Sequence, residues 1–428
     1  MANGGQGTGT AATADIVAAG TEDTLGWRDK RTLPSHLRDM LALEDFEAVA
    51  WRRLPRPIYG YVSGGVETNA SLRANRAAFD EIAFVPKMLV DTSMRALTTT
   101  LFGQTYAAPF GLAPMGGSSL AAYQGDIVLA RSAAEANIPM ITSGASLTAL
   151  EKVKQAGRTS WFQAYLPGED PVIGELVDRA ARAGFDTLVL TVDVQVLSNR
   201  ENNVRSGYNS PLRPTPRLAW DCMIRPRWLF GMFLRTLLLH GMPHFENMGP
   251  RSPLISSTGV RSRGRRDKLT WKHVELMRRL WKGRLVLKGI LDPEDARVAR
   301  ESGVDGVIVS NHGGRQLDGA VAPLRALPGV KAEAGDMTVM MDSGVRRGTD
   351  VLKALALGAQ FVFIGRPFLY AAVVAGDEGV AHAIKLLREE IDRDMALIGI
   401  ASLAEMGPHR LTAARGVDFL PGAEVVKG

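Results

Sequence analysis

The sequence predicts an α/β fold: a (β/α)₈ TIM barrel with an N-terminal helical segment and a long insertion after the fourth strand. Short apolar runs recur along the chain, each ended by glycine or a polar residue, as expected for strands buried on both faces. Helical patterns such as "TWKHVELMRRLW" lie between most of them. Eight parallel strands alternating with helices close into a barrel. The eight runs are FGLAPM (110–115), IPMITS (138–143), WFQAYL (161–166), TLVLTVD (187–193), LVLKGI (285–290), GVIVSN (306–311), TVMMDSG (338–344) and QFVFIGR (360–366).

Composition limits the class of protein. The chain has 428 residues, of which 46% are hydrophobic and 22% charged, enough for a large core. Cys222 is the only cysteine, so no intramolecular disulfide can form and a reducing compartment is expected. The net charge of +6 is compatible with anionic partners, although a basic soluble enzyme is the simpler interpretation.

The chain organisation follows from these patterns. We expect a disordered tail over 1–30, a helical segment over 31–95, and the barrel over 96–400. The barrel carries the insertion 203–268, and a C-terminal tail follows over 401–428.

The insertion contains an apolar stretch flanked by arginines, "RPRWLFGMFLRTLLLHGM". Its core is too short to span a bilayer. Residues 225–240 instead predict an amphipathic helix, which either lies on a membrane surface or covers the barrel mouth or an oligomer interface. The basic run "RSRGRRDK" lacks interleaved aromatic residues, so we expect no nucleic-acid partner.

Polar residues stand at the ends of the predicted strands, where the loops of a barrel carry its chemistry. His312 follows the sixth strand and is a candidate general base, because imidazole titrates near neutral pH. Arg315 lies three residues on, after two glycines, and a guanidinium can hold a carboxylate through two hydrogen bonds. A base beside a carboxylate clamp indicates a substrate acid with a removable proton near its carboxylate.

This stretch, "SNHGGRQLDG", resembles the signature of the FMN-dependent 2-hydroxy acid oxidases and dehydrogenases. That family includes glycolate oxidase, lactate oxidase, flavocytochrome b2 and the bacterial L-lactate and mandelate dehydrogenases. The resemblance continues through "YGYVSGGVETNASLRANRAAF", "LAPMGG", "WFQAYL", "LTVDVQVLSNRE", "LVLKGILDPEDA", "MMDSGVRRGTDVLKALALGA" and "VFIGRPFLY". The insertion most resembles that of the bacterial L-lactate dehydrogenases.

The resemblance implies roles for individual residues. It makes His312 the catalytic base and Asp193 the carboxylate that partners it and raises its pKa. Four residues match those that bind the substrate, namely Tyr61, Tyr165, Arg200 and Arg315, with Tyr165 near the reacting oxygen.

The same resemblance implies FMN as the cofactor and no metal ion. Lys288 matches the lysine beside the flavin ring, where a cation stabilises the reduced, anionic form. The other residues that match FMN contacts are Pro114, Met115, Gly116, Thr142, Gln163, Thr191, Ser310, Asp342, Gly344, Arg346, Gly365 and Arg366.

The implied activity is oxidation of a lactate-like or mandelate-like L-2-hydroxy acid, with electrons passed to a quinone or another carrier. Gly144 replaces a bulky aromatic residue of glycolate-oxidase-like members, Gly116 replaces the alanine of many oxidases, and Ser198 replaces a glycine near Arg200. An oxygen-using oxidase that makes hydrogen peroxide is one alternative. A membrane- or nucleic-acid-binding protein with a vestigial flavin site is the alternative from another class. The resemblance further implies a cytoplasmic homotetramer or larger assembly, attached peripherally to the inner face of the membrane if residues 225–240 bind lipid.

Overall fold

The computed structural model describes residues 33–166, 170–247, 251–255 and 266–414. The expected tail over 1–30 and most of "RSRGRRDK" lie outside these residues. The chain divides into two units at Asp39, and the described part of the first contains the 3₁₀ helix η3 (Ser35–Leu37). The second unit, from Met40 onward, contains every other element.

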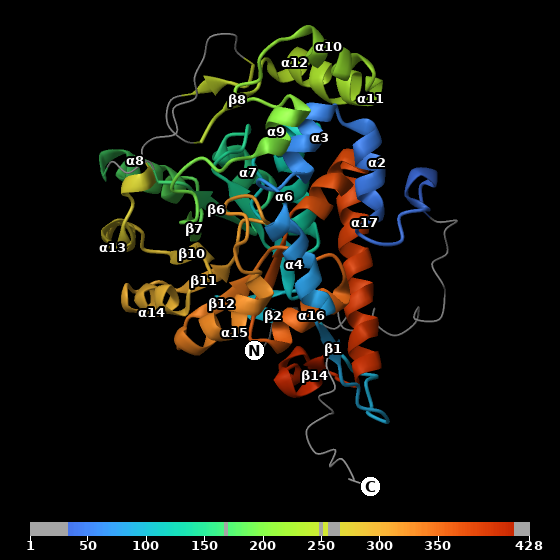
Figure 1. The fold of residues 1–428 in the computed structure, drawn as a ribbon, viewed down its shortest axis with the longest axis vertical. Helices are drawn as coiled ribbons and strands as arrows, with labels where there is room; N and C mark the ends of the chain where they lie inside the picture. Colours follow the sequence, from blue (N-terminus) through green and yellow to red (C-terminus); the bar gives the residue numbers. More distant parts are fainter. Residues whose placement is uncertain (1–32, 167–169, 248–250, 256–265, 415–428) are drawn as a thin grey trace, which may run out of the picture. The chain divides into compact units, whose positions relative to one another are not determined.

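Eight parallel strands form a closed barrel in the second unit (Figure 1), which confirms the predicted fold class. The strand order around the barrel is β10-β11-β12-β13-β4-β5-β6-β7, so each strand pairs with its neighbours in sequence and the first closes on the last. The strands are β4 (Phe110–Leu112), β5 (Met140–Ser143), β6 (Ser160–Ala164), β7 (Thr187–Thr191), β10 (Arg284–Ile290), β11 (Gly306–Val309), β12 (Thr338–Met341) and β13 (Phe361–Ile364).

The barrel interior is filled by apolar side chains from alternate strand positions, as a small closed barrel requires. The branched or flexible residues Ile141, Val189, Val286, Ile308 and Met340 form one cluster with three large aromatic residues. Those aromatic residues are Trp161, Phe361 and Phe363, and Trp161 packs edge-on against Phe363 at 5.3 Å. The hairpin of β2 (Thr99–Leu101) and β3 (Gln104–Tyr106) adds Leu101 and Tyr106 to the same cluster.

Helices surround the barrel (Figure 1). They are α6 (Gly125–Glu135), α7 (Leu150–Ala156), α8 (Asp170–Arg182), α13 (Trp271–Leu280), α14 (Pro293–Glu301), α15 (Pro323–Glu333), α16 (Gly348–Ala356) and α17 (Arg366–Ile398). Helix α17 is interrupted at Ala375 and Gly376, whose backbone angles are not helical. Its break therefore separates an upper part, beside the insertion, from a long lower part.

Three helices and a short strand precede the barrel, within the segment 31–95: α2 (Asp45–Arg53), α3 (Arg56–Ser63), α4 (Ala70–Asp80) and β1 (Ile82–Phe84). Helix α2 packs against α17, and α15 packs against α4. Within the segment expected to be a C-terminal tail, η6 (Leu403–Glu405) and η7 (Pro408–Arg410) lead to β14 (Leu411–Ala413). Strand β14 pairs with β1, so this stretch is held against the body of the protein.

The insertion lies between β7 and β10. It contains α9 (Glu201–Ser206), α10 (Pro216–Met223), α11 (Pro226–Trp228), the π-helical η4 (Leu229–Leu234), α12 (Arg235–His240), β8 (His244–Phe245), β9 (Ser252–Pro253) and η5 (Arg266–Lys268). Three of these, α11, η4 and α12, follow without a break as one helical stretch over 226–240. Trp228 and Met232 of this stretch are buried, whereas Phe230, Leu238 and Leu239 are 64%, 83% and 62% exposed. None of the helices in the described ranges is long and apolar enough to cross a membrane.

Candidate active site

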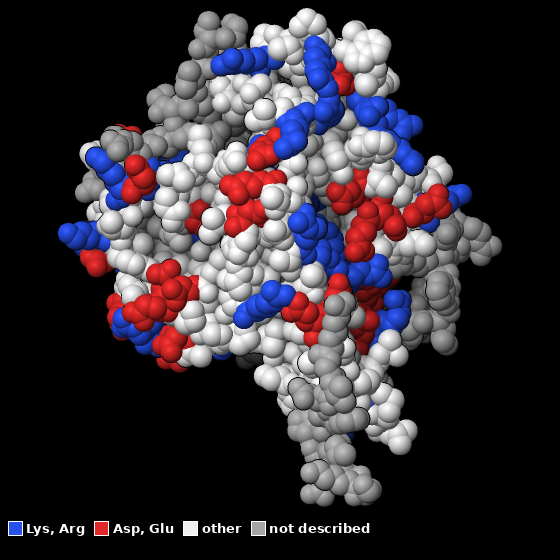
Figure 2. Space-filling view, in the orientation of Figure 1, with Lys and Arg blue, Asp and Glu red and all other residues white. Residues whose placement is uncertain are grey.

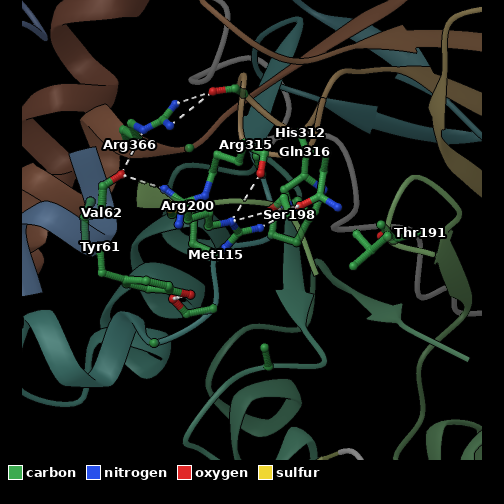
Figure 3. A pocket seen from close by; sticks show the side chains of 18 of the residues that line it. Tyr61, Val62, Met115, Thr191, Ser198, Arg200, His312, Arg315, Gln316 and Arg366 are labelled. Carbon is green, nitrogen blue, oxygen red and sulfur yellow. Dashed lines mark hydrogen bonds between the residues drawn. The ribbon is translucent and has the colours of Figure 1, made fainter. Parts of the chain in front are cut away.

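A cavity of about 490 Å³ opens at the carboxyl ends of the barrel strands (Figure 3). The loops after the strands form its floor, and α3 and the insertion contribute the rest of its wall. Fifteen of the residues predicted from the sequence line it: Tyr61, Pro114, Met115, Gly116, Tyr165, Thr191, Arg200, Lys288, His312, Arg315, Asp342, Gly344, Arg346, Gly365 and Arg366. The other four, Thr142, Gln163, Asp193 and Ser310, lie on barrel strands or within two residues of their carboxyl ends.

His312 is held at the cavity by an unusual backbone. Its φ is 59°, and Gly313 and Gly314 continue in the left-handed region at 66° and 72°. Side chains other than glycine rarely adopt this region, and such conformations concentrate at functional sites. A Cβ on Gly314 would lie 2.5 Å from the backbone nitrogen of Leu72 in α4, so only glycine fits there. The loop is therefore fixed between the barrel and α4.

His312 and Asp193 form a largely buried pair. The Nδ1 atom of His312 lies 3.0 Å from Oδ1 of Asp193. Burial raises the pKa of Asp193, but His312 and Lys288 outweigh it, so the net direction is down. The pKa of His312 is also lowered, because burial and the cations Lys288 and Arg200 outweigh the attraction of Asp193. The direction is opposite to the raised pKa expected for His312, and a lowered pKa favours the neutral imidazole, the form in which a general base accepts a proton.

Lys288 is a buried cation with two partners. Its Nζ atom lies 3.0 Å from Oδ2 of Asp342 and donates to Oγ of Ser310 at 2.8 Å. Burial lowers its pKa, but Asp342 and Asp193 more than compensate, and the net pKa is raised. The ammonium group therefore keeps its charge inside the protein.

Three guanidinium groups converge beside His312 (Figure 3). Arg315 donates to the carbonyl of Gly64 at 2.8 Å, and Arg366 donates to the carbonyl of Val62 at 2.9 Å. Arg200 completes the group from the loop after β7. In the described part of the chain, no carboxylate forms an ion pair with any of the three.

These arginines are crowded with like charge. Burial, followed by repulsion from Arg200 and Arg366, lowers the pKa of Arg315 to about 9. Burial is also the largest cause that lowers the pKa of Arg366 to about 10. An anionic ligand would relieve both the repulsion and the lost hydration. The arrangement is thus suited to bind carboxylate or phosphate groups.

Two tyrosines complete the polar wall. The hydroxyl of Tyr61 donates to the carbonyl of Gly116 at 3.3 Å, and its ring stacks on Tyr208 at 4.3 Å. The guanidinium group of Arg315 also lies over the Tyr61 ring, with its central carbon 5.0 Å from the ring centre. Burial raises the pKa of Tyr165, so its hydroxyl stays protonated and can donate a hydrogen bond.

Three buried polar atoms on adjacent strands have no hydrogen-bond partner among the described residues. They are Oγ1 of Thr142 on β5, Nε2 of Gln163 on β6 and Oγ1 of Thr191 on β7. Unsatisfied buried polar atoms are rare in native proteins and call for a ligand or bound water. Their positions on consecutive strands indicate one extended ligand with several polar atoms.

Gln316 was not predicted from the sequence, yet it joins two parts of the site. Its Oε1 accepts from Arg200 at 2.7 Å, and its Nε2 donates to the backbone carbonyl of Asp193 at 2.9 Å. Ser198 also accepts from Arg200, at 3.0 Å. The signal in the sequence was the position of Gln316 directly after Arg315, in the loop that also carries His312.

The sequence profile of the FMN-dependent dehydrogenases matches residues 50–413. The chain belongs to this family. It is similar to (S)-mandelate dehydrogenase of Pseudomonas putida, with 36% identity over 393 residues that cover 90% of this chain and 98% of the relative. It is also similar to L-lactate dehydrogenase of Yersinia pestis (strain Pestoides F), with 37% identity over 380 residues that cover 87% and 98%.

Solved structures agree with this assignment. A crystal structure described as the monotopic membrane protein (S)-mandelate dehydrogenase has a TM-score of 0.81 and 35% identity, over 88% of this chain and all of the other. A structure of mandelate oxidase bound to 2-hydroxy-phenylacetamide has a TM-score of 0.73 and 33% identity, over 88% and 99%.

The family is FMN-dependent, and the residues present fit this cofactor. The unpartnered atoms of Thr142, Gln163 and Thr191 could bond to the polar atoms of a flavin ring and its side chain. Lys288, whose raised pKa keeps its ammonium group charged, offers a cation to the flavin ring. Arg346, whose pKa burial lowers, and Arg366 offer guanidinium groups to a phosphate at the end of the barrel where phosphate commonly binds.

Proposed function

We propose that this protein oxidises an L-2-hydroxy acid to the corresponding 2-keto acid, with FMN as cofactor and His312 as the base. One observation carries the proposal: His312, which is paired with Asp193, lines the same cavity as Arg200 and Arg315, and these two arginines lack a carboxylate partner among the described residues. A neutral base beside two unpaired cations matches the needs of a substrate that combines a carboxylate with an alcohol.

The residues divide the work as follows. Arg315 and Arg200 hold the substrate carboxylate, with Tyr61 beside them, and so fix the Cα carbon near His312. His312 takes a proton, and Asp193, 3.0 Å away, stabilises the imidazolium that results. The hydroxyl of Tyr165 donates to the reacting oxygen. Bound FMN would supply the two-electron acceptor, and Lys288 would place positive charge beside it.

The substrate side chain would meet an apolar wall made by Ala145, Leu147, Phe245 and Leu254, which all line the cavity. We therefore expect apolar side chains, from the methyl of lactate to the phenyl of mandelate. Anaerobic bleaching of the flavin by a panel of L-2-hydroxy acids tests this directly. An enzyme that bleaches with none of the acids would refute the proposed reaction.

For the electron acceptor we propose a quinone or another carrier rather than oxygen. Gly116 supports this, because many oxidases of the family carry alanine at the matching position. An alanine here would be crowded, since its Cβ would lie 3.0 Å from Cβ of Ala145 and 3.3 Å from Oη of Tyr61. The similarity to mandelate oxidase supports the alternative, an oxidase that makes hydrogen peroxide. Anaerobic reduction followed by either oxygen or a quinone analogue separates the two, since a dehydrogenase is reoxidised much faster by the quinone.

We further propose peripheral attachment to the inner face of the membrane, from the cytoplasm. The exposed apolar residues of 226–240 support this, and the similar (S)-mandelate dehydrogenase is described as monotopic. A homotetramer or larger assembly would hold several such helices at one surface and strengthen binding. Sedimentation with vesicles and light scattering test attachment and assembly separately.

A further inference from the structure

A second cavity, of about 580 Å³, lies at the base of the insertion, away from the barrel mouth. One wall is the inner side of the 226–240 helix. The other walls are the start of α6, the end of α2 and the break in α17 at Ala375 and Gly376. None of its lining residues takes part in the proposed reaction.

Positive charge dominates this cavity. Arg53, Arg131, Arg227 and Arg235 line it, against the two acids Asp377 and Glu378. Arg131 pairs with Asp377 through two contacts of 2.9 and 3.0 Å. Within the described ranges, Arg53, Arg227 and Arg235 form no ion pair. Figure 2 shows Lys and Arg side chains at the end of the molecule where α10, α11 and α12 lie.

Arg53 is the cavity arginine whose charge and donors are least well satisfied. Two backbone carbonyls at the break in α17, those of Val373 and Val374, accept from its NH1 atom. Its Nε atom is buried and has no partner among the described residues. Burial, followed by repulsion from Arg227, lowers the pKa of Arg53. A bound anion would satisfy the free donor and relieve the repulsion.

The walls of the cavity are firmly held. The indole Nε1 of Trp228 donates to the carbonyl of Leu120 at 2.9 Å in a buried contact. Arg225 donates to the carbonyl of Leu54 at 3.1 Å, and the hydroxyl of Tyr123 lies 3.0 Å from Nε2 of His240. The guanidinium carbon of Arg235 lies over the ring of Tyr123, 3.9 Å from its centre. These contacts tie both ends of the 226–240 helix to neighbouring segments, so the backbone that carries Arg227 and Arg235 is held in place.

We propose that this cavity binds the phosphate of an anionic membrane lipid. Guanidinium groups recognise phosphate through paired hydrogen bonds, and three of them surround the space. The same helix exposes Phe230, Leu238 and Leu239, which are the residues able to contact acyl chains. Phosphate recognition next to an exposed apolar surface favours a lipid over free phosphate. This inference rests on the proposed peripheral attachment and adds selectivity for the headgroup.

The test compares binding of the FMN-loaded, full-length protein to phosphatidylcholine vesicles with and without phosphatidylglycerol. The variant Arg227→Gln/Arg235→Gln removes two unpaired cations from the cavity. The matched control, Arg213→Gln/Arg217→Gln, removes the same charge from exposed positions of the insertion that do not line it. A basic side chain near an anionic surface contributes roughly fivefold, so the cavity variant, which loses two, should lose about 25-fold in binding to the anionic vesicles.

The control variant should lose less than about twofold, because exposed charges far from a bound headgroup are screened. Equal losses in both variants would show diffuse attraction and overturn the headgroup site. Unchanged binding of both variants would overturn it as well. Wild-type protein that binds neither vesicle would refute the peripheral attachment, while substrate bleaching of the flavin tests the proposed reaction independently.

Two further measurements exclude other occupants. Calorimetry with inorganic phosphate, in the absence of vesicles, should show at most weak binding. Tight phosphate binding that the cavity variant loses, together with no preference for phosphatidylglycerol, would assign the cavity to a free phosphate and overturn the lipid proposal. Gel filtration should show the same assembly for both variants, and a smaller assembly for the cavity variant alone would make the cavity a subunit interface.

Discussion

Two regions of the molecule each gather three arginines that have no carboxylate partner in the described residues. In the active-site cavity, Arg200, Arg315 and Arg366 are partly buried. Arg315 and Arg366 donate hydrogen bonds to backbone carbonyls, and Arg200 donates to the side chain of Gln316. At the insertion, Arg227 and Arg235 are exposed, and Arg53 alone is partly buried.

The two regions differ in how strictly they can select the anion that they bind. Partly buried guanidinium groups with fixed partners accept one anion in one orientation, since any misplaced charge would stay unpaired at high cost. Arg227 and Arg235 line one cavity with Arg53 but are open to solvent, so salt weakens their attraction to an anion more than it does for the partly buried groups. The first arrangement suits a reaction centre and the second suits a surface. The predictions below test this contrast, from the largest expected effect to the smallest.

Replacing His312 should have the largest effect. His312→Ala removes the proposed base, so reduction of the flavin by substrate should slow by about 10²–10⁴-fold. The protein should remain yellow, because the residues expected to hold FMN are unchanged. Stopped-flow absorbance under anaerobic conditions measures the rate, and near-normal bleaching would refute the role of His312.

The exposed apolar residues of the insertion should matter only for lipid. Phe230→Ser/Leu238→Ser removes two side chains that would enter the membrane, at about 1.5–3 kcal/mol each, so binding to vesicles should fall about 100-fold or more. Met88→Ser/Leu397→Ser is a matched control, since these residues are 64% exposed but lie outside the insertion. Substrate bleaching should stay normal in both variants. Equal losses of vesicle binding in the two variants would show that the insertion is not the docking surface.

Gln316 should act through Arg200. Gln316→Leu removes the acceptor 2.7 Å from Arg200, and a hydrogen bond to a charged group contributes about 1.5–3 kcal/mol, so KM should rise about tenfold or more. The turnover number should change less, because the base and its carboxylate remain. Steady-state kinetics with a soluble acceptor give this split. A loss confined to the turnover number would place Gln316 with the base instead.

The pH profile should show the smallest effect. The pKa of His312 lies below its ordinary value of 6.5, and the base is active only when neutral, so activity is lost as the pH falls through that lowered pKa. More than half of the base is then neutral at pH 6.5, so kcat/KM should fall less than about twofold between about pH 7.5 and 6.5. A raised pKa would give a much steeper decline over the same range.

The barrel could be predicted closely because its pattern repeats. Each apolar run ended at a polar residue, and the polar residues Lys288, His312 and Asp342 do meet in one cavity. Their order along the chain was enough, since parallel strands bring their carboxyl ends to one rim. The family motifs added the residues on the loops.

Other features depend on three-dimensional packing that no local pattern encodes. The net pKa shift of His312 depends on how deeply it is buried and on two cations, Lys288 from β10 and Arg200 from the loop after β7. Gln316 gains its importance only because Arg200 arrives from the insertion side. The sequence predicted one amphipathic helix over 225–240, but residues 229–234 form a π-helical segment. The pairing of β14 with β1 joins residues more than 300 positions apart, which the sequence did not reveal.

Gly314 has a consequence for how the protein could be dissected. It touches Leu72 of α4 so closely that no side chain fits, its carbonyl accepts from Val66, and Asn75 bonds to Asn311 across the same contact. The helices ahead of the barrel thus clamp the loop that carries the imidazole. A fragment starting at residue 96 would contain all eight barrel strands and yet leave that loop unsupported. The enzyme is not modular at this boundary, and circular permutants or fusions need to retain the stretch from α3 to α4 intact.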